Sequence, residues 1–326
     1  MKLTPMMFLV VALGAPSPQT FLGGGQGIGF DDLGFAPILR KVMVPAGGTG
    51  KLALIDPDSQ QIEIVGGFSE QTSYSGGHGE GITSADACRG LMYVTDRSAK
   101  LLDILDPGTK KILASAQLAS GPDYVRFVPD TNEAWITEPG AERIEIFALP
   151  NEGVGAPTHT GFIPVPGGPE SLIIGRERAF THLWNGKTLA IDLRTRKIVE
   201  RWSNGCRGSR GIALDEKRGF LFAGCDEGRL SVLDVKTGKL LSEASSGSGV
   251  DVIAYNQKLA HVYLPGAESA TISIVAISPN GAAKVLRTAH TVEGAHCATV
   301  DDRDQVYVCD PVHGKILVFK DSLRDL

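Results

Sequence analysis

Short apolar runs that close on an aspartate or a polar residue recur along the chain at nearly even spacing. Clear copies are 51–56, 101–106, 188–192 and 229–234, and weaker copies are 143–147, 271–275 and 315–319. These seven copies are spaced by about 44 residues, a repeat length typical of β-propellers. The repeat predicts one closed ring, although a chain of 326 residues would otherwise suggest two domains.

Within one repeat, apolar and polar side chains alternate in four short stretches. In the third repeat the stretches are 123–128, 133–137, 142–148 and 159–165. Alternation with a period of two predicts β-strands, and four strands joined by short turns form an antiparallel meander. The fold class is therefore predicted to be all-β, a seven-bladed β-propeller of four-stranded antiparallel blades over residues 27–326.

The aspartates that close the clear copies have a structural explanation. Asp56 and Asp106 are each followed by proline, the preferred order in a type I turn. Asp192 and Asp234 keep the aspartate and a threonine three residues later. We therefore assign these carboxylates to turns and not to catalysis.

The predicted second strand carries a recognisable signature in three repeats, just before the apolar run of the third strand. It reads Tyr-Val-Thr-Asp at 93–96, Trp-Ile-Thr-Glu at 135–138 and Tyr-Val-Cys-Asp at 307–310. These segments resemble the signature of the YVTN-type β-propeller repeat family. The resemblance implies a seven-bladed, usually exported propeller, and related propellers include lactonases and lyases. The segments at 182–185, 222–225 and 263–266 depart from the signature.

The N-terminus predicts export. Residues 1–15 hold one lysine and then an apolar stretch that is too short to span a bilayer as a helix. This pattern indicates a signal peptide, with a disordered arm as the alternative, and places the protein in the periplasm or outside the cell. No transmembrane segment is expected in the mature chain. Residues 16–26, rich in proline and glycine, are predicted to be a linker. The last repeat shows three strands, so its fourth either comes from near residues 20–22 or is missing.

The five cysteines allow two disulfide bonds. Cys297 and Cys309 flank a predicted hairpin, and Cys206 and Cys225 flank another. Both bonds are predicted, and buried free thiols are the alternative in each case. Cys88 is left over.

A second repeated pattern marks the start of each first strand, where the channel mouth should lie. It has the form glycine, any residue, then a polar residue. The polar positions are Asp123, Glu170, Arg210, Asp251 and His296, with His78 and Glu80 in the second repeat. The first repeat reads Gly-Ile-Gly at 27–29, with nothing ionisable. The following links add Arg97 and Trp184 to the same face, and Tyr124 and Trp184 are candidates for stacking on a flat or sugar-like ligand.

Four carboxylates around one axis repel unless a cation, a proton or arginine offsets them. Oxygen ligands with one imidazole suit one divalent cation, Ca²⁺, Mg²⁺, Mn²⁺ or Zn²⁺. The candidate metal ligands are Glu80, Asp123, Glu170, Asp251 and His296. The alternative is a water-filled mouth with solvated side chains.

Three functions are compatible with this pattern. The favoured one is a monomeric propeller that binds a small molecule or a protein partner at the mouth, through Asp123, Tyr124, Glu170, Trp184, Arg210 and Asp251. The alternative is a metal-dependent hydrolase or lyase resembling the propeller lactonases, in which His296 or Glu80 moves a proton. The third is a scaffold with an inert channel. A net charge of −5 without a basic run argues against nucleic acid as a partner.

Overall fold

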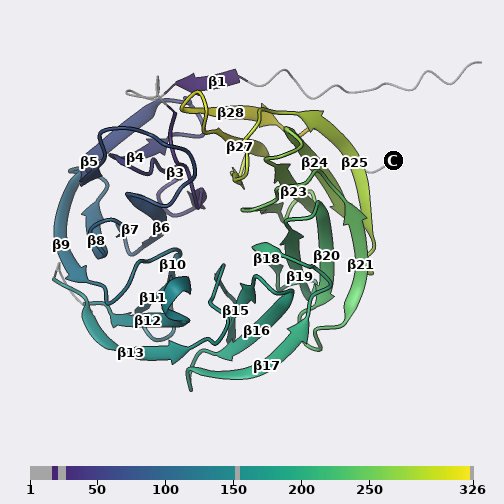
Figure 1. Cartoon of the computed structure of the whole chain (residues 1–326), viewed down its shortest axis with the longest axis horizontal. Helices are drawn as coiled ribbons and strands as arrows, with labels where there is room; N and C mark the ends of the chain where they lie inside the picture. Colours follow the sequence, from purple (N-terminus) through teal and green to yellow (C-terminus); the bar gives the residue numbers. More distant parts are fainter. Residues whose placement is uncertain (1–16, 21–26, 151–154, 324–326) are drawn as a thin grey trace, which may run out of the picture.

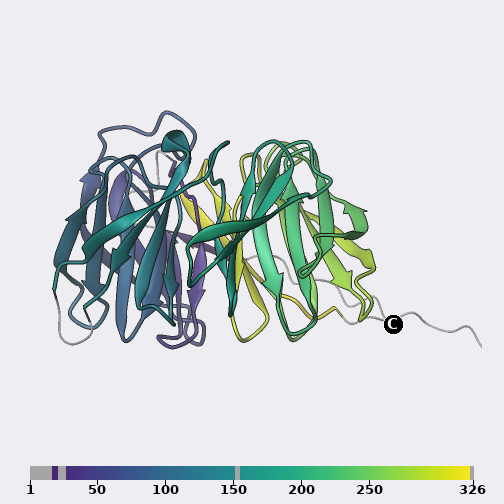
Figure 2. The ribbon, with the colours of Figure 1, turned by 90° about the horizontal axis from the view of Figure 1, so that it is seen from below.

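Seven four-stranded antiparallel sheets stand around a central axis (Figure 1). The structure is a computed structural model that describes residues 17–20, 27–150 and 155–323. Seen from the side, the strands run roughly along the axis, and the loops lie on two opposite faces (Figure 2). The predicted all-β, seven-bladed architecture is confirmed.

Six blades are continuous in sequence, each with its first strand nearest the axis. Blades 1 to 3 are β2 (Gly34–Ala36), β3 (Lys41–Pro45), β4 (Thr49–Ile55), β5 (Ile62–Glu70); β6 (Ile82–Cys88), β7 (Leu91–Asp96), β8 (Leu101–Asp106), β9 (Lys111–Gln117); and β10 (Val125–Val128), β11 (Glu133–Glu138), β12 (Arg143–Ala148), β13 (Thr158–Pro164). Blades 4 to 6 are β14 (Ile173–Ile174), β15 (Arg178–Leu183), β16 (Lys187–Asp192), β17 (Lys197–Ser203); β18 (Ser209–Asp215), β19 (Phe220–Cys225), β20 (Arg229–Asp234), β21 (Leu240–Ser245); and β22 (Ala254–Asn256), β23 (His261–Gly266), β24 (Thr271–Ile277), β25 (Ala283–His290). One 3₁₀ turn, η2, covers Pro139–Ala141.

The seventh blade joins the two ends of the chain. It consists of β26 (Ala298–Val300), β27 (Gln305–Asp310), β28 (Lys315–Lys320) and, on its outer edge, β1 (Ser17–Thr20). β1 pairs antiparallel with β28, with Ser17 opposite Val318. A strand therefore occupies part of the segment expected to be a linker, because the open edge of β28 offers it backbone partners. The signal-peptide segment, residues 1–15, lies outside the described residues. Across the described residues, no helix has the length and apolar character needed to cross a membrane.

Side-chain burial explains why these segments are strands. The second strand of a blade is buried on both faces, as in β11, where every residue is buried. The outer strands alternate instead, as in β9, because only one face packs against the blade. The apolar core lies between neighbouring blades: Met43 and Leu54 of blade 1 share a cluster with Met92 and Val94 of blade 2.

The turn aspartates have the predicted structural role. Asp56 Oδ1 accepts the backbone N–H of Ser59 at 2.9 Å and its hydroxyl at 3.0 Å. Asp234 Oδ1 accepts the N–H and the hydroxyl of Thr237, both at 2.8 Å. The side chain thus satisfies the turn's own donors.

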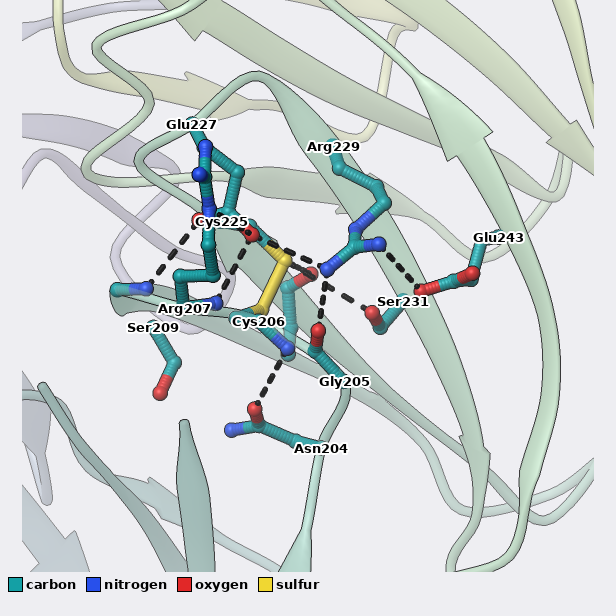
Figure 3. The surroundings of a disulfide bond; sticks show 12 residues. Asn204, Gly205, Cys206, Arg207, Ser209, Cys225, Glu227, Arg229, Ser231 and Glu243 are labelled. Atoms are coloured by element: carbon teal, nitrogen blue, oxygen red, sulfur yellow. Dashed lines mark hydrogen bonds and ion pairs between the residues drawn. A yellow bond between two sulfur atoms is a disulfide. The ribbon is translucent and has the colours of Figure 1, made fainter. Parts of the chain in front are cut away.

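One of the two predicted disulfides is present. Cys206, in the loop before β18, is bonded to Cys225 at the end of β19 (Figure 3). Cys297 and Cys309 are instead free and buried, as is Cys88. Their strands do place them opposite each other, but Cys309 Sγ accepts the backbone N–H of Cys297 at 3.1 Å and is not bonded to the other sulfur.

Candidate functional site

A polar cavity of about 380 Å³ lies at the mouth of the channel. The segments that lead into the inner strands β10, β14, β18 and β22 supply much of its wall, together with the links between second and third strands. Its lining residues are Asp31, His78, Arg97, Gly121, Pro122, Asp123, Tyr124, Pro139, Gly140, Glu170, Trp184, Arg210 and Asp251. Charged residues from six blades therefore meet around one axis.

Eight residues that the sequence analysis placed at the mouth come together in this wall. They are His78, Arg97, Asp123, Tyr124, Glu170, Trp184, Arg210 and Asp251. Tyr124 is buried, and the Arg126 guanidinium lies 4.9 Å from its ring centroid, so Tyr124 does not offer an open stacking face. Trp184 is 56% exposed and does offer one.

Two predicted residues lie elsewhere. Glu80 is exposed and lines a separate hollow of about 340 Å³ under the loop of residues 71–80. His78, two residues earlier in that loop, occupies the position at the axis that was expected for Glu80. In a loop, unlike in a strand, side chains do not point alternately to the two sides. His296 does not line the cavity, but its ring stacks on that of His78 with 5.0 Å between centroids.

Asp31 was missed by the sequence analysis. The first repeat was expected to place nothing ionisable at the mouth, but Asp31, before β2, is buried in the wall. The signal was present as two consecutive aspartates just beyond Gly29. The glycine pattern pointed to 27–29, whereas the chain reaches the axis a few residues later.

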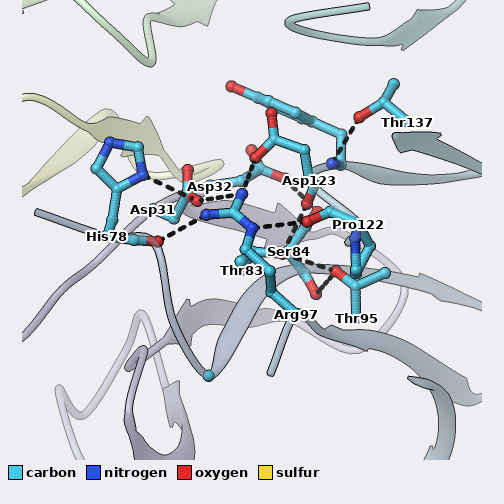
Figure 4. A network of polar contacts seen from close by, with 12 residues as sticks. Asp31, Asp32, His78, Thr83, Ser84, Thr95, Arg97, Pro122, Asp123 and Thr137 are labelled. Atoms are coloured by element: carbon cyan, nitrogen blue, oxygen red, sulfur yellow. Dashed lines mark hydrogen bonds and ion pairs between the residues drawn. The ribbon is translucent and has the colours of Figure 1, made fainter. Parts of the chain in front are cut away.

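Arg97 contacts several polar groups in one half of the mouth (Figure 4). Its guanidinium pairs with Asp123 and lies 3.4 Å from Asp31 Oδ2. It also donates to the carbonyl oxygens of Pro122 and His78, both at 2.8 Å. These contacts tie the loop that carries His78 to blade 3.

The carboxylates of this half determine the charge on His78. Its Nδ1 is 3.1 Å from Asp31 Oδ2 and its Nε2 is 3.5 Å from Asp251 Oδ2. The negative charge of Asp31 raises the pKa of His78 to about 9 against the opposing effect of burial. Burial by itself would raise the pKa of Asp31, but the charges of His78 and Arg97 outweigh it and lower that pKa. Both groups are therefore charged at neutral pH.

The other half of the mouth centres on Glu170. Arg210 Nη1 donates to Glu170 Oε1 at 3.0 Å, and the indole N–H of Trp184 donates to Oε2. The Arg210 guanidinium lies 4.2 Å from the Trp184 ring centroid, within cation–π range. Burial, with the charges of Asp251 and Asp123, raises the pKa of Glu170 to about 9. The exposed indole is thus held in place by two partners on the wall.

Burial also raises the pKa of Asp123 to about 8, and the charge of Asp31 adds to the shift. Two of the four mouth carboxyls, those of Asp123 and Glu170, therefore retain protons more readily than a carboxyl in water. The arginines beside them, Arg97 and Arg210, provide further compensation.

His296 has no free ring nitrogen. Its Nδ1 is 2.7 Å from Gly294 O and its Nε2 is 2.9 Å from Phe30 O, and a carbonyl oxygen can only accept. Burial would lower its pKa, but the Cys309 thiolate and Asp251 raise it well above the usual range. In this arrangement His296 is a double donor, which differs from the proton acceptor expected of a general base.

The residues predicted to hold a metal do not form one ligand set. Within the described part of the chain, two sets of three side chains bring their ligand atoms within 4.8 Å of one another: His78, Asp251 and His296, and His296, Cys297 and Cys309. Glu80, Asp123 and Glu170 belong to neither set. Two arginines and two imidazoles can offset the four mouth carboxylates, which meets the requirement that suggested a metal.

The fold and its mouth define the chain as a seven-bladed β-propeller with a polar channel opening. No family model and no curated protein matches its sequence, so no family match supports the resemblance to YVTN-type repeats. Solved structures share the fold at low identity. A chain of the "Crystal Structure of Mitotic Checkpoint Complex" has a TM-score of 0.77 at 11% identity, covering 100% of this chain and 97% of its own.

Two further solved structures are similar. The propeller domain of Cps50 (Swd1) from Myceliophteria thermophila has a TM-score of 0.75 at 13% identity, covering 94% of this chain and 100% of its own. Hydrazine synthase from Kuenenia stuttgartiensis has a TM-score of 0.72 at 11% identity, covering 91% and 96%. Identities this low establish the fold and leave function to the site.

Proposed function

We propose that this protein is a binding propeller that takes a polar, ring-bearing small molecule into the channel mouth. The observation that carries the proposal is Trp184, an exposed indole fixed by Glu170 and Arg210 at a cavity of about 380 Å³. A tryptophan held this way offers a stacking face at little cost in side-chain entropy. The carboxyls and guanidiniums beside it supply acceptors and donors for hydroxyl, amine or amide groups.

A protein partner on the same face is the second candidate occupant. The support is the similarity to a chain of the Mitotic Checkpoint Complex, which by its description is a component of an assembly. A partner's side chain with a flat polar group would use the same contacts. We also propose a periplasmic or extracellular location, which the Cys206–Cys225 disulfide supports because such bonds persist in oxidising compartments.

A metal-dependent hydrolase or lyase has less support from the geometry. As a general base, His296 would have to give up a hydrogen bond to a backbone carbonyl before it could accept a proton. Glu80, the other proposed proton carrier, lies outside the mouth cavity.

Tryptophan fluorescence and calorimetry test the binding proposal. The chain has three tryptophans, and Trp135 and Trp202 are buried, so a ligand at the mouth should change the emission of Trp184. We would screen monosaccharides, nucleosides and amino acids against the wild type, Trp184→Ala and the control Trp202→Phe. Loss of the stacking face should weaken binding by about tenfold.

The outcome distinguishes a small-molecule ligand from a protein partner at the mouth. A compound that binds the wild type and the control about tenfold more tightly than Trp184→Ala supports the small-molecule site. Equal binding by all three proteins places the ligand elsewhere and refutes the proposal. If no compound binds, a purified partner whose affinity falls in Trp184→Ala and not in Trp202→Phe would assign the mouth to a protein.

A further inference from the structure

Two thiols and an imidazole meet at the inner end of the seventh blade, next to β26 and β27. Cys297 precedes β26 and Cys309 lies in β27, where the Cys309 N–H donates to Cys297 O at 3.0 Å. The two residues are therefore directly opposite each other, and both are fully buried. His296 Nδ1 lies 3.8 Å from Cys309 Sγ, and the three ligand atoms lie within 4.8 Å of one another.

We propose that His296, Cys297 and Cys309 bind a thiophilic d¹⁰ cation, Zn²⁺ or Cu⁺. Two sulfurs and one imidazole nitrogen form a soft ligand set, which selects such cations over Ca²⁺ or Mg²⁺. With Zn–S and Zn–N bonds of about 2.3 and 2.0 Å, tetrahedral ligands lie about 3.5 to 3.8 Å apart. The observed separation of 3.8 Å between Nδ1 and Sγ already has this scale.

The second ring nitrogen of His296 is arranged as it would be in a metal site. His296 Nε2 faces the carbonyl oxygen of Phe30 at 2.9 Å. A ligating histidine commonly donates its other N–H to a backbone carbonyl, which fixes the tautomer and the ring orientation. Binding would then exchange the Nδ1 contact with Gly294 O, at 2.7 Å, for the cation, with release of the Nδ1 proton and of the thiol protons to solvent.

The surroundings favour a positive ion. Asp31 and Asp251 both contact His78, whose ring stacks on His296, so two carboxylates lie one residue away from the proposed ligands. The same chain forms the Cys206–Cys225 disulfide and leaves this opposed pair of thiols unbonded. A bound cation would keep such thiols from oxidising. The site uses residues outside the mouth cavity and is independent of the binding function proposed above.

Cation titration of the full chain, purified without oxygen and without chelator, tests this site. Cd²⁺ reports thiolate ligation by its ultraviolet charge-transfer absorption, and Zn²⁺ is then measured by displacement of Cd²⁺. Cu⁺ is measured by competition with bicinchoninate. We expect one Zn²⁺ or one Cu⁺ per chain, with affinity on the order of a hundredfold weaker in Cys309→Ser and in His296→Gln.

Cys88→Ser is the matched control, because Cys88 is also a buried free thiol but lies in β6 of blade 2. It should bind like the wild type. Cys297→Ala provides a second ligand variant if Cys309→Ser does not fold by circular dichroism. Absence of cation binding in the folded wild type, binding retained in the ligand variants, or a Cys297–Cys309 disulfide in non-reduced peptides of the anaerobic protein would overturn the proposal.

Discussion

His182 should make the protein less stable as the pH falls below neutral. This residue in β15 is fully buried, and its two nitrogens have different partners: Nδ1 lies 2.9 Å from the Thr188 hydroxyl and Nε2 lies 3.3 Å from Phe222 O in the next blade. The neutral ring satisfies both, by accepting from the hydroxyl and donating to the carbonyl. Burial lowers the pKa of His182 to about 4, below the usual 6.5.

Proton linkage gives the sign and size of this change in the unfolding free energy. Because the folded state binds the proton less readily, the stabilisation is complete above about pH 6.5 and is lost as the pH falls towards 4. A shift of this size corresponds to about 3 kcal/mol in full, and to about 2 kcal/mol between pH 7.5 and pH 5.

Urea unfolding followed by circular dichroism at pH 7.5 and pH 5 measures the loss. His182→Gln cannot titrate, so the difference in unfolding free energy between wild type and variant should shrink by about 2 kcal/mol at pH 5. His290→Gln, at an exposed histidine, is the control for the change in composition. A difference that stays constant with pH would refute the assignment of a neutral buried ring.

Two further substitutions should lower the unfolding free energy. Cys225→Ser opens a loop closed over 19 residues and should lower the unfolding free energy by about 3 kcal/mol, measured by urea unfolding; an unchanged midpoint would mean that the bond is absent. Arg126→Met leaves Asp32, its buried partner at 2.6 Å, without a counter-charge and should lower the unfolding free energy by about 3 to 5 kcal/mol. The double variant that also carries Asp32→Asn should recover part of this stability, and no recovery would contradict the pairing.

The repeat made the fold predictable, whereas the site was predictable only where strands fix the direction of side chains. Asp123, Glu170 and Asp251 precede inner strands and Arg210 lies at the start of one, all at the repeat spacing, and all four reach the mouth. In the second blade, a loop replaces that regularity, so the sequence could not decide between His78 and Glu80. Each mouth carboxylate is paired with a charged side chain from another blade, as Asp123 is with Arg97. Such pairs join residues far apart in the chain, so the sequence around each residue does not predict them.

The pairing of β1 with β28 makes the first described strand and the last one neighbours in a single blade. During synthesis, β1 emerges first but has no partner until β28 has been made, so ring closure comes last, after six other blades can already have formed. Because the two ends of the ring lie side by side, a peptide linker joining them would also allow the chain to be cut within another blade. Circular permutants of this kind would move the closing strand and show whether the protein depends on having it in the seventh blade.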